Sequence, residues 1–222
     1  MLPLKDSPVS RRFPYVNIAL ILANLFIFFQ QLAMSESQLH AFVFTHGLIP
    51  NHLFGSLAQG HLAVALAPLV SYQFMHGGWL HVGSNMLYLW VFGDNIEDRL
   101  GHAKYLVFYL LTGALAGLAQ ALTDPAGLMP VIGASGAVAG VLGAYLVSCP
   151  GARVLALVPV FFFLTLAEIP AVIFLGFWFV LQIFSGFASI GMEIQVAWWA
   201  HIGGFLAGLL LVGLFGKKIE CK

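Results

Sequence analysis

Long apolar runs constrain the fold of this chain more than any other feature of its sequence. Six of them approach the roughly 20 residues that an α-helix needs to cross a bilayer. Only 8% of the 222 residues are charged, against about 25% in soluble domains. We therefore predict an all-α membrane protein with a short, recessed fourth helix. The six predicted transmembrane helices cover residues 15–33, 81–94, 105–122, 135–149, 171–188 and 198–215.

The basic residues predict how the chain crosses the membrane. Lys and Arg collect on cytoplasmic loops, and with six spans and a cytoplasmic N-terminus every basic residue falls on the inner side. Two shorter apolar segments, 62–74 and 154–167, are expected to lie in the interface. Counting 154–167 as a span would move the C-terminal lysines outside. The inner basic residues are Lys5, Arg11, Arg12, Arg99, Lys104, Arg153, Lys217, Lys218 and Lys222.

The predicted organisation is a single domain with short ends. Residues 1–14 form a cytoplasmic segment, 15–216 the six-span domain and 217–222 a cytoplasmic tail. The first apolar run lacks a small-residue cleavage site, which favours a retained span. The brief N-terminus without a transit signal favours a bacterial plasma membrane and leaves an organellar membrane as the alternative. The formal net charge is zero, and no basic patch indicates nucleic-acid binding. Cys149 and Cys221 both fall on the inner side, where thiols are expected to stay reduced.

Three polar side chains from distant spans are predicted to lie at one depth. Ser135 precedes Pro150 by fifteen residues, and His81 and His201 each precede an inner charged residue by sixteen. At ~1.5 Å per residue they stand about 22–24 Å above the inner boundary of a hydrocarbon core about 30 Å thick. Asn85 lies one turn deeper than His81 on the same helical face. Polar groups at this depth are costly, so they are candidate functional residues.

These residue types predict acyl-transfer chemistry. Ser135 is a weak nucleophile until a base takes its proton, and the imidazole of His201 is the candidate base. No carboxylate is predicted at this level, so we expect a dyad. The free N–H of Ser135 at a helix start, with His81 and Asn85, could stabilise an oxyanion. Small residues would let the helices approach closely, and they are Gly133, Gly136, Gly140, Gly204 and Gly208.

Taken together, these residues resemble a known family. The motifs are Gly133-Ala134-Ser135-Gly136, Ala200-His201 with Gly204 and Gly208, His81 with Asn85, and Gly93-x3-Glu97-x3-Gly101. Their order and spacing are similar to those of rhomboid intramembrane serine proteases, over about residues 72–208. The resemblance implies a six-helix fold that cleaves single-pass transmembrane proteins near the outer membrane face through an acyl-enzyme. It also implies that 171–188 forms a lateral gate and 127–132 caps the site.

Position 139 departs from the pattern of some family members, which carry a tyrosine under the histidine. The residue here is Ala139, so aromatic side chains of the fifth span such as Trp178 are expected to support His201. Two alternatives stay open, a non-catalytic relative that binds transmembrane helices and a small transporter. No metal site is expected, because no carboxylate or cysteine joins His76 and His81. We expect no cofactor, and a monomer or weak oligomer in a lipid bilayer.

Overall fold

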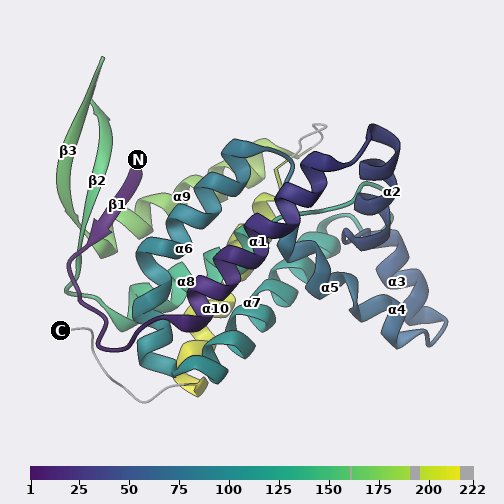
Figure 1. Cartoon of the computed structure of the whole chain (residues 1–222), viewed down its shortest axis with the longest axis horizontal. Helices are drawn as coiled ribbons and strands as arrows, with labels where there is room; N and C mark the ends of the chain where they lie inside the picture. Colours follow the sequence, from purple (N-terminus) through teal and green to yellow (C-terminus); the bar gives the residue numbers. More distant parts are fainter. Residues whose placement is uncertain (161, 191–195, 216–222) are drawn as a thin grey trace.

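The structure, a computed structural model, describes residues 1–160, 162–190 and 196–215. Its helices form a bundle with a small sheet at one end (Figure 1). Among the described residues, four helices have the length and hydropathy to cross a membrane. These are α1 (Tyr15–Ala33), α7 (His102–Thr123), α9 (Ala171–Ala188) and α10 (Trp198–Phe215). The chain is thus a mostly helical membrane protein, as predicted.

Two further long helices complete the bundle, α6 (Trp79–Leu100) and α8 (Ser135–Ser148). That these two also span a membrane, which would make six spans, stays a prediction. α6 continues beyond the predicted end at Asp94 to Leu100, and the φ of +79° at the next residue, Gly101, suits glycine and lets α7 begin at once. The helix bounds at 15–33, 171–188 and 198–215 coincide with the predicted ranges.

The inner end of α6 holds the start of α1. Pro14 precedes α1 and offers no side-chain cap. Instead the buried carboxylate of Glu97 accepts hydrogen bonds from the backbone N–H groups of Val16 (3.0 Å) and Asn17 (2.7 Å). A carboxylate at a helix N-terminus satisfies free N–H groups and complements the helix dipole. One turn earlier, a Cβ on Gly93 would come within 2.1 Å of the Asn17 side chain, so α1 and α6 approach closely here.

α8 is the central helix, almost wholly buried among α6, α7 and α10. A Cβ on Gly204 would lie 2.1 Å from the carbonyl oxygen of Gly136. A Cβ on Gly208 would lie 1.8 Å from the carbonyl oxygen of Gly140. Real Cβ atoms do not approach that closely, so the backbones of α8 and α10 are in direct contact along these four glycines.

The long connection between α1 and α6 folds into short helices at the end of the bundle opposite the sheet (Figure 1). The apolar segment 62–74 is divided at Pro68, which begins a new helix rather than continuing the old one. The elements of this connection are α2 (Glu36–His46), α3 (Pro50–Ala58), α4 (Leu62–Leu66), α5 (Pro68–Ser71) and the 3-10 helix η1 (Tyr72–Phe74).

A three-stranded antiparallel sheet is the main departure from the predicted all-α fold. Its order is β1 (Leu2–Asp6), β2 (Arg153–Val160) and β3 (Phe163–Pro170). The segment 154–167 therefore forms a hairpin, to which the N-terminal strand adds, with Leu2 opposite Leu157. Valines and Pro159 favour strands over helix in this segment, and β1 supplies a pairing partner that is distant in sequence.

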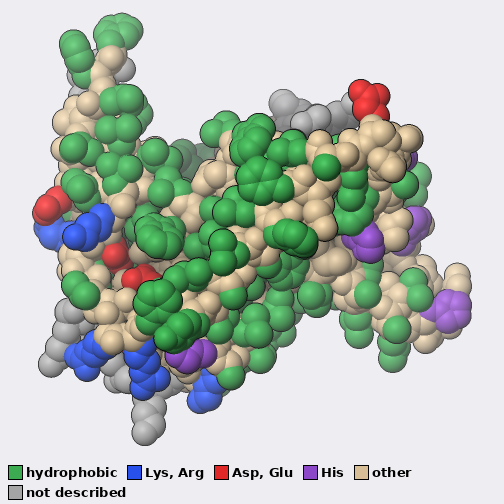
Figure 2. Space-filling model, in the orientation of Figure 1, with side chains coloured by type: hydrophobic (Ala, Val, Ile, Leu, Met, Phe, Trp, Pro, Cys, Tyr) green, Lys and Arg blue, Asp and Glu red, His purple; other side chains and the backbone are tan. Residues whose placement is uncertain are grey.

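Figure 2 shows the Lys and Arg side chains at one end of the molecule. There the backbone N–H of Arg11 donates to Asp98, and Arg12 lies beside the same carboxylate. The tail 217–222, with its predicted inner lysines, lies outside the described residues. The prediction of a reduced Cys149 is wrong, because this cysteine is disulfide-bonded. The buried sulfur is therefore covalently engaged, and Cys221 is not among the described residues.

Candidate active site

The side chains of Ser135 and His201 meet between α8 and α10. Ser135 is the first residue of α8, and His201 lies in the first turn of α10. The Nε2 atom of His201 is 2.8 Å from the hydroxyl oxygen of Ser135. The four-glycine contact between the helices begins at Gly136 and Gly204, next to both residues. The close backbone approach therefore brings the two side chains within hydrogen-bonding distance.

The other ring nitrogen of His201 faces Gln182 on α9. Its Nδ1 atom lies 2.8 Å from Oε1 of Gln182, whose Nε2 donates to the backbone carbonyl of Trp178 at 3.0 Å. Because that carbonyl only accepts, the amide oxygen of Gln182 must face His201. Nδ1 then carries the proton, and Nε2 is the free acceptor toward Ser135.

Gln182 is a residue that our sequence reasoning missed. It is buried within α9, a helix composed almost entirely of apolar residues. A polar amide inside such a helix is itself a signal of a specific partner. The sequence does not say which neighbouring helix the amide faces, so the partner could be identified only from the packing of α9 against α10.

Two tryptophans flank the ring of His201. Trp178 lies with its ring centroid 6.1 Å from the imidazole, as expected for an aromatic support from this helix, at a tilt of 35°. Trp198 approaches edge-on, with a centroid distance of 5.8 Å. Ala139 is fully buried below the serine. The aromatic rings beside His201 thus come from α9 and α10.

His81 lies across Gly133 from the serine. Gly133 has φ +133°, and a Cβ there would be 2.7 Å from Nε2 of His81 and 3.7 Å from the hydroxyl of Ser135. Any larger residue would be strained and would fill this space. The backbone N–H of Gly77 donates to Nδ1 of His81 at 3.5 Å. That contact favours the tautomer of His81 that carries its proton on Nε2, the ring nitrogen on the side of Ser135.

Asn85 and His76 carry buried polar atoms that form no hydrogen bond within the described part of the chain. Asn85 is 6% exposed, and its Nδ2 meets no acceptor among the described residues. His76 is 2% exposed and lies with its ring centroid 5.0 Å from that of His81. Burial, aided by His81, lowers the pKa of His76 to about 3, so this imidazole is neutral. Unpaired buried donors are costly unless a ligand or water meets them.

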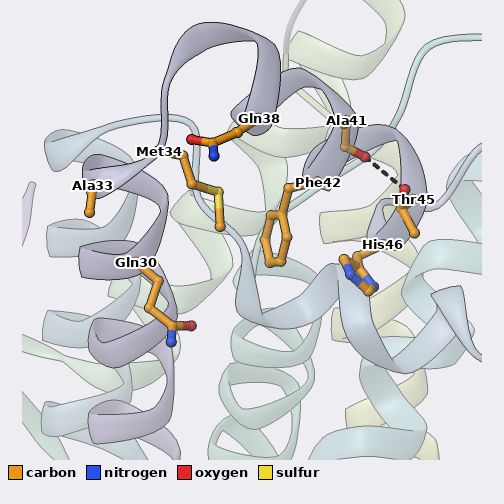
Figure 3. Close-up of a pocket in the computed structure, with 8 residues that line it drawn as sticks. All are labelled: Gln30, Ala33, Met34, Gln38, Ala41, Phe42, Thr45 and His46. Carbon is orange, nitrogen blue, oxygen red and sulfur yellow. Dashed lines mark hydrogen bonds between the residues drawn. The ribbon is translucent and has the colours of Figure 1, made fainter.

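A separate hollow lies away from Ser135 and His201. Figure 3 shows it between the end of α1 and α2, with a volume of about 660 Å³. Its lining includes Gln30, Gln38 and Phe42, and none of the residues around Ser135. Thr45 on its wall donates to the carbonyl of Ala41, so that hydroxyl is already paired. We assign this hollow no catalytic role, since the Thr45 hydroxyl donates to the Ala41 carbonyl and not to His46, which also lines the hollow.

Comparisons with known proteins agree with the motifs. The family described as Rhomboid domain matches residues 63–218. Rhomboid protease GluP of Bacillus subtilis (strain 168) is 32% identical over 167 residues, 73% of this chain and 29% of that protein. Rhomboid protein 1, mitochondrial, of Saccharomyces cerevisiae is 28% identical over 172 residues, 74% of this chain and 46% of the relative. The putative rhomboid protease YdcA of Bacillus subtilis (strain 168) is 29% identical over 137 residues, 61% of this chain and 63% of that protein. The chain spans less than two thirds of the length of each of these relatives.

Proposed function

The chain belongs to the rhomboid family, and on that premise we propose that it is an intramembrane serine endopeptidase with Ser135 as nucleophile and His201 as general base. The single observation that carries the proposal is the 2.8 Å contact between His201 Nε2 and the Ser135 hydroxyl. A serine needs a base at hydrogen-bonding distance to become a nucleophile, and this pair has that geometry. Relatives of similar sequence are named as proteases, which supports the same activity.

The proposed reaction hydrolyses one peptide bond in two half-reactions. The Ser135 oxygen attacks the substrate carbonyl carbon, and its proton passes to Nε2 of His201. The tetrahedral oxyanion collapses, the C–N bond breaks, and Nε2 gives that proton to the leaving amine. Water then attacks the acyl-enzyme ester and passes a proton to Nε2. The bond to Ser135 breaks, the serine recovers the proton, and the carboxylic acid product leaves.

The oxyanion is proposed to form beside three donors. The backbone N–H of Ser135 is one of the free N–H groups in the first turn of α8, where the helix dipole favours negative charge. Nε2–H of His81 and the unpaired Nδ2 of Asn85 supply the others. An unpaired buried donor costs free energy in the resting enzyme. It gains its partner when charge develops on the substrate oxygen, which favours the transition state over the ground state.

Gln182 is proposed as the positioning residue of the pair. Its amide oxygen holds the proton of His201 on Nδ1, which leaves Nε2 free to accept from Ser135. An acidic residue performs this task in a catalytic triad. A neutral amide does so without placing a charge in a membrane-embedded helix, where a carboxylate would be costly.

The proposal extends to the arrangement in the membrane. α6 and α8 are taken to cross the bilayer with the other four helices, within a domain at 15–216. The basic end would face the cytoplasm, as the positive-inside rule requires. Ser135 starts α8 at the opposite end, so single-pass transmembrane substrates would be cut near the outer face. α9 would be their lateral gate and 127–132 the cap. A bacterial plasma membrane is the proposed location.

Cleavage of a model single-pass substrate in proteoliposomes tests the proposal. Ser135→Ala and His201→Ala should each lower kcat by roughly 10⁴-fold or more. The matched control is Ser148→Ala, which removes a buried hydroxyl from the other end of α8. A fluorophosphonate should label Ser135 in the native protein and not in Ser135→Ala. Undiminished cleavage by Ser135→Ala would exclude the dyad, and substrate binding without turnover would favour a non-catalytic relative.

A further inference from the structure

The distal half of the β2–β3 hairpin is apolar and stands clear of the helix bundle (Figure 1). Phe162 is 98% exposed, and Phe163 and Leu164, which follow it, are 76% and 69% exposed. Successive residues of a strand point to opposite faces, so neither face of β3 is covered near the tip. Exposed apolar side chains gathered in one place mark a surface that meets a partner.

The root of the hairpin has the opposite character. Val154 and Ala156 are fully buried, and Arg153 forms an ion pair with Glu168, with 3.5 Å between Nε and Oε2. Residues 156–167, between these charges, contain no charged side chain. The root leaves the bundle between the end of α8 and the start of α9, at the end that carries the Lys and Arg side chains. The charged side chains and the fully buried side chains of the hairpin thus lie at its root.

The turn has a composition that is unusual for water. The two residues between the paired Val160 and Phe163 are both phenylalanine. Sequences that join two paired strands in water favour Gly, Asn and Asp. A two-stranded hairpin with both faces uncovered is also marginal in water. Both features indicate that the tip lies in a less polar medium.

We propose that the distal half of this hairpin is seated in the inner interfacial layer of the lipid bilayer, with Phe162 reaching the acyl chains. From Glu168 to Phe163 the strand extends about 17 Å, longer than the polar layer of one leaflet. Within the described residues β3 pairs with a strand, β2, along one edge only, and a strand edge that lacks a partner strand is not found deep in hydrocarbon. A shallow position in the interfacial layer satisfies both conditions, because headgroups and water can hydrogen-bond to the edge of β3 while acyl chains contact the tip.

A second copy of the chain is the rival occupant, since an open apolar edge strand can pair with another strand. Edge pairing would cover the backbone of β3 but would leave Phe162, at the turn, uncovered. The exposed surface also continues along α9, where Val172, Ile173 and Phe177 face outward. A bilayer would cover the hairpin tip and these exposed residues of α9 together, whereas a strand paired with β3 would not.

Photo-crosslinking of the full-length protein in vesicles tests the proposal. A benzoylphenylalanine at position 162 replaces an aromatic side chain that touches little else, so folding should be retained. The matched control carries the same probe at position 168, at the charged root of the same hairpin. In vesicles of phosphatidylethanolamine and phosphatidylglycerol, lipid adducts should be several-fold more abundant at 162 than at 168. Equal yields, no lipid adduct at 162, or protein dimers in their place would each overturn the proposal.

A second measurement separates a bilayer contact from a structural role. The double variant Phe162→Asp with Phe163→Asp should lower the thermal unfolding midpoint in vesicles and leave it unchanged in detergent. Val9→Asp, at an exposed apolar residue of the same end outside the hairpin, is the control. Equal losses in vesicles and detergent would mean that the tip serves folding alone, which contradicts a lipid seat. Neither experiment depends on protease activity.

Discussion

The side-chain oxygen of Gln182 lies 2.8 Å from Nδ1 of His201, while Nε2 of the same ring meets Ser135. Three helices therefore contribute to one hydrogen-bonded chain, with the hydroxyl on α8, the imidazole on α10 and the amide on α9. The imidazole is held at both nitrogens, which fixes its tautomer and its orientation toward Ser135. The position of α9 thus contributes directly to the orientation of the His201 imidazole.

Replacing Gln182 by Leu should lower kcat by ~10–100-fold, with KM nearly unchanged, because the imidazole loses its orientation but substrate contacts remain. Gln182→Glu should retain activity and move the acid limb of the kcat/KM profile to higher pH, since a carboxylate favours the protonated imidazole. Ser185→Ala, one turn away on α9, should behave as wild type. A purely structural Gln182 would lower the fraction of active enzyme without any change in the pH profile.

Loss of a single oxyanion donor should act on kcat. His81→Ala and Asn85→Ala are each expected to lower kcat by roughly 10²–10³-fold, because a donor to the developing oxyanion is removed. KM should change little, since these donors are proposed to pair fully only in the transition state. Fluorophosphonate labelling should slow in parallel with cleavage. A rise in KM at constant kcat would instead assign the residue to ground-state binding.

Gly208→Ala should destabilise the protein and move Ser135 away from His201. The new methyl group would be 1.8 Å from the carbonyl oxygen of Gly140, so α8 and α10 must move apart. Overpacking of this kind costs about 1–3 kcal/mol. Thermal unfolding in detergent and cleavage rate should both fall. Gly213→Ala is the control on the same helix, where a Cβ meets nothing within 4 Å. Equal behaviour of the two variants would show that the close contact is dispensable.

The pH dependence of stability should reveal Asp6 on β1. Burial raises the pKa of Asp6 from 3.8 to about 6, although the hydrogen bond from Tyr145 on α8 opposes the shift. The folded state therefore holds a proton that the unfolded chain has lost, so stability falls as pH rises from about 4 to 6 and is level above. After allowance for solvent screening the loss is about 1–2 kcal/mol.

Asp6→Asn should remove this slope, because the amide cannot ionise and its oxygen can still accept from Tyr145. Unfolding midpoints measured between pH 4 and 7.5 would then be nearly constant in the variant and would decline in the wild type. Tyr145→Phe should destabilise the protein at every pH. An unchanged slope in Asp6→Asn would assign the pH dependence to other groups.

The sequence predicted the elements that depend on local composition. The apolar runs predicted three helices with the bounds that the structure has. Counting residues from the inner ends of the helices placed Ser135 and His201 at the same depth, and in the structure their side chains are in contact. Features that depend on distant partners were missed. The sheet needs the pairing of β1 with β2, and the buried site of His76 depends on the packing of α1 and η1 around it. Gln182 was overlooked because its partner lies on another helix.

The pairing of β1 with β2 has a consequence for biosynthesis. Leu2 is made first, yet its partner Leu157 emerges from the ribosome only after about 10–30 s of translation at ~5–20 residues per second. By then α1, α6 and α7 have been synthesised. Completion of the sheet is therefore a late event in maturation, and β1 stays unpaired until most of the helices of the bundle have been synthesised.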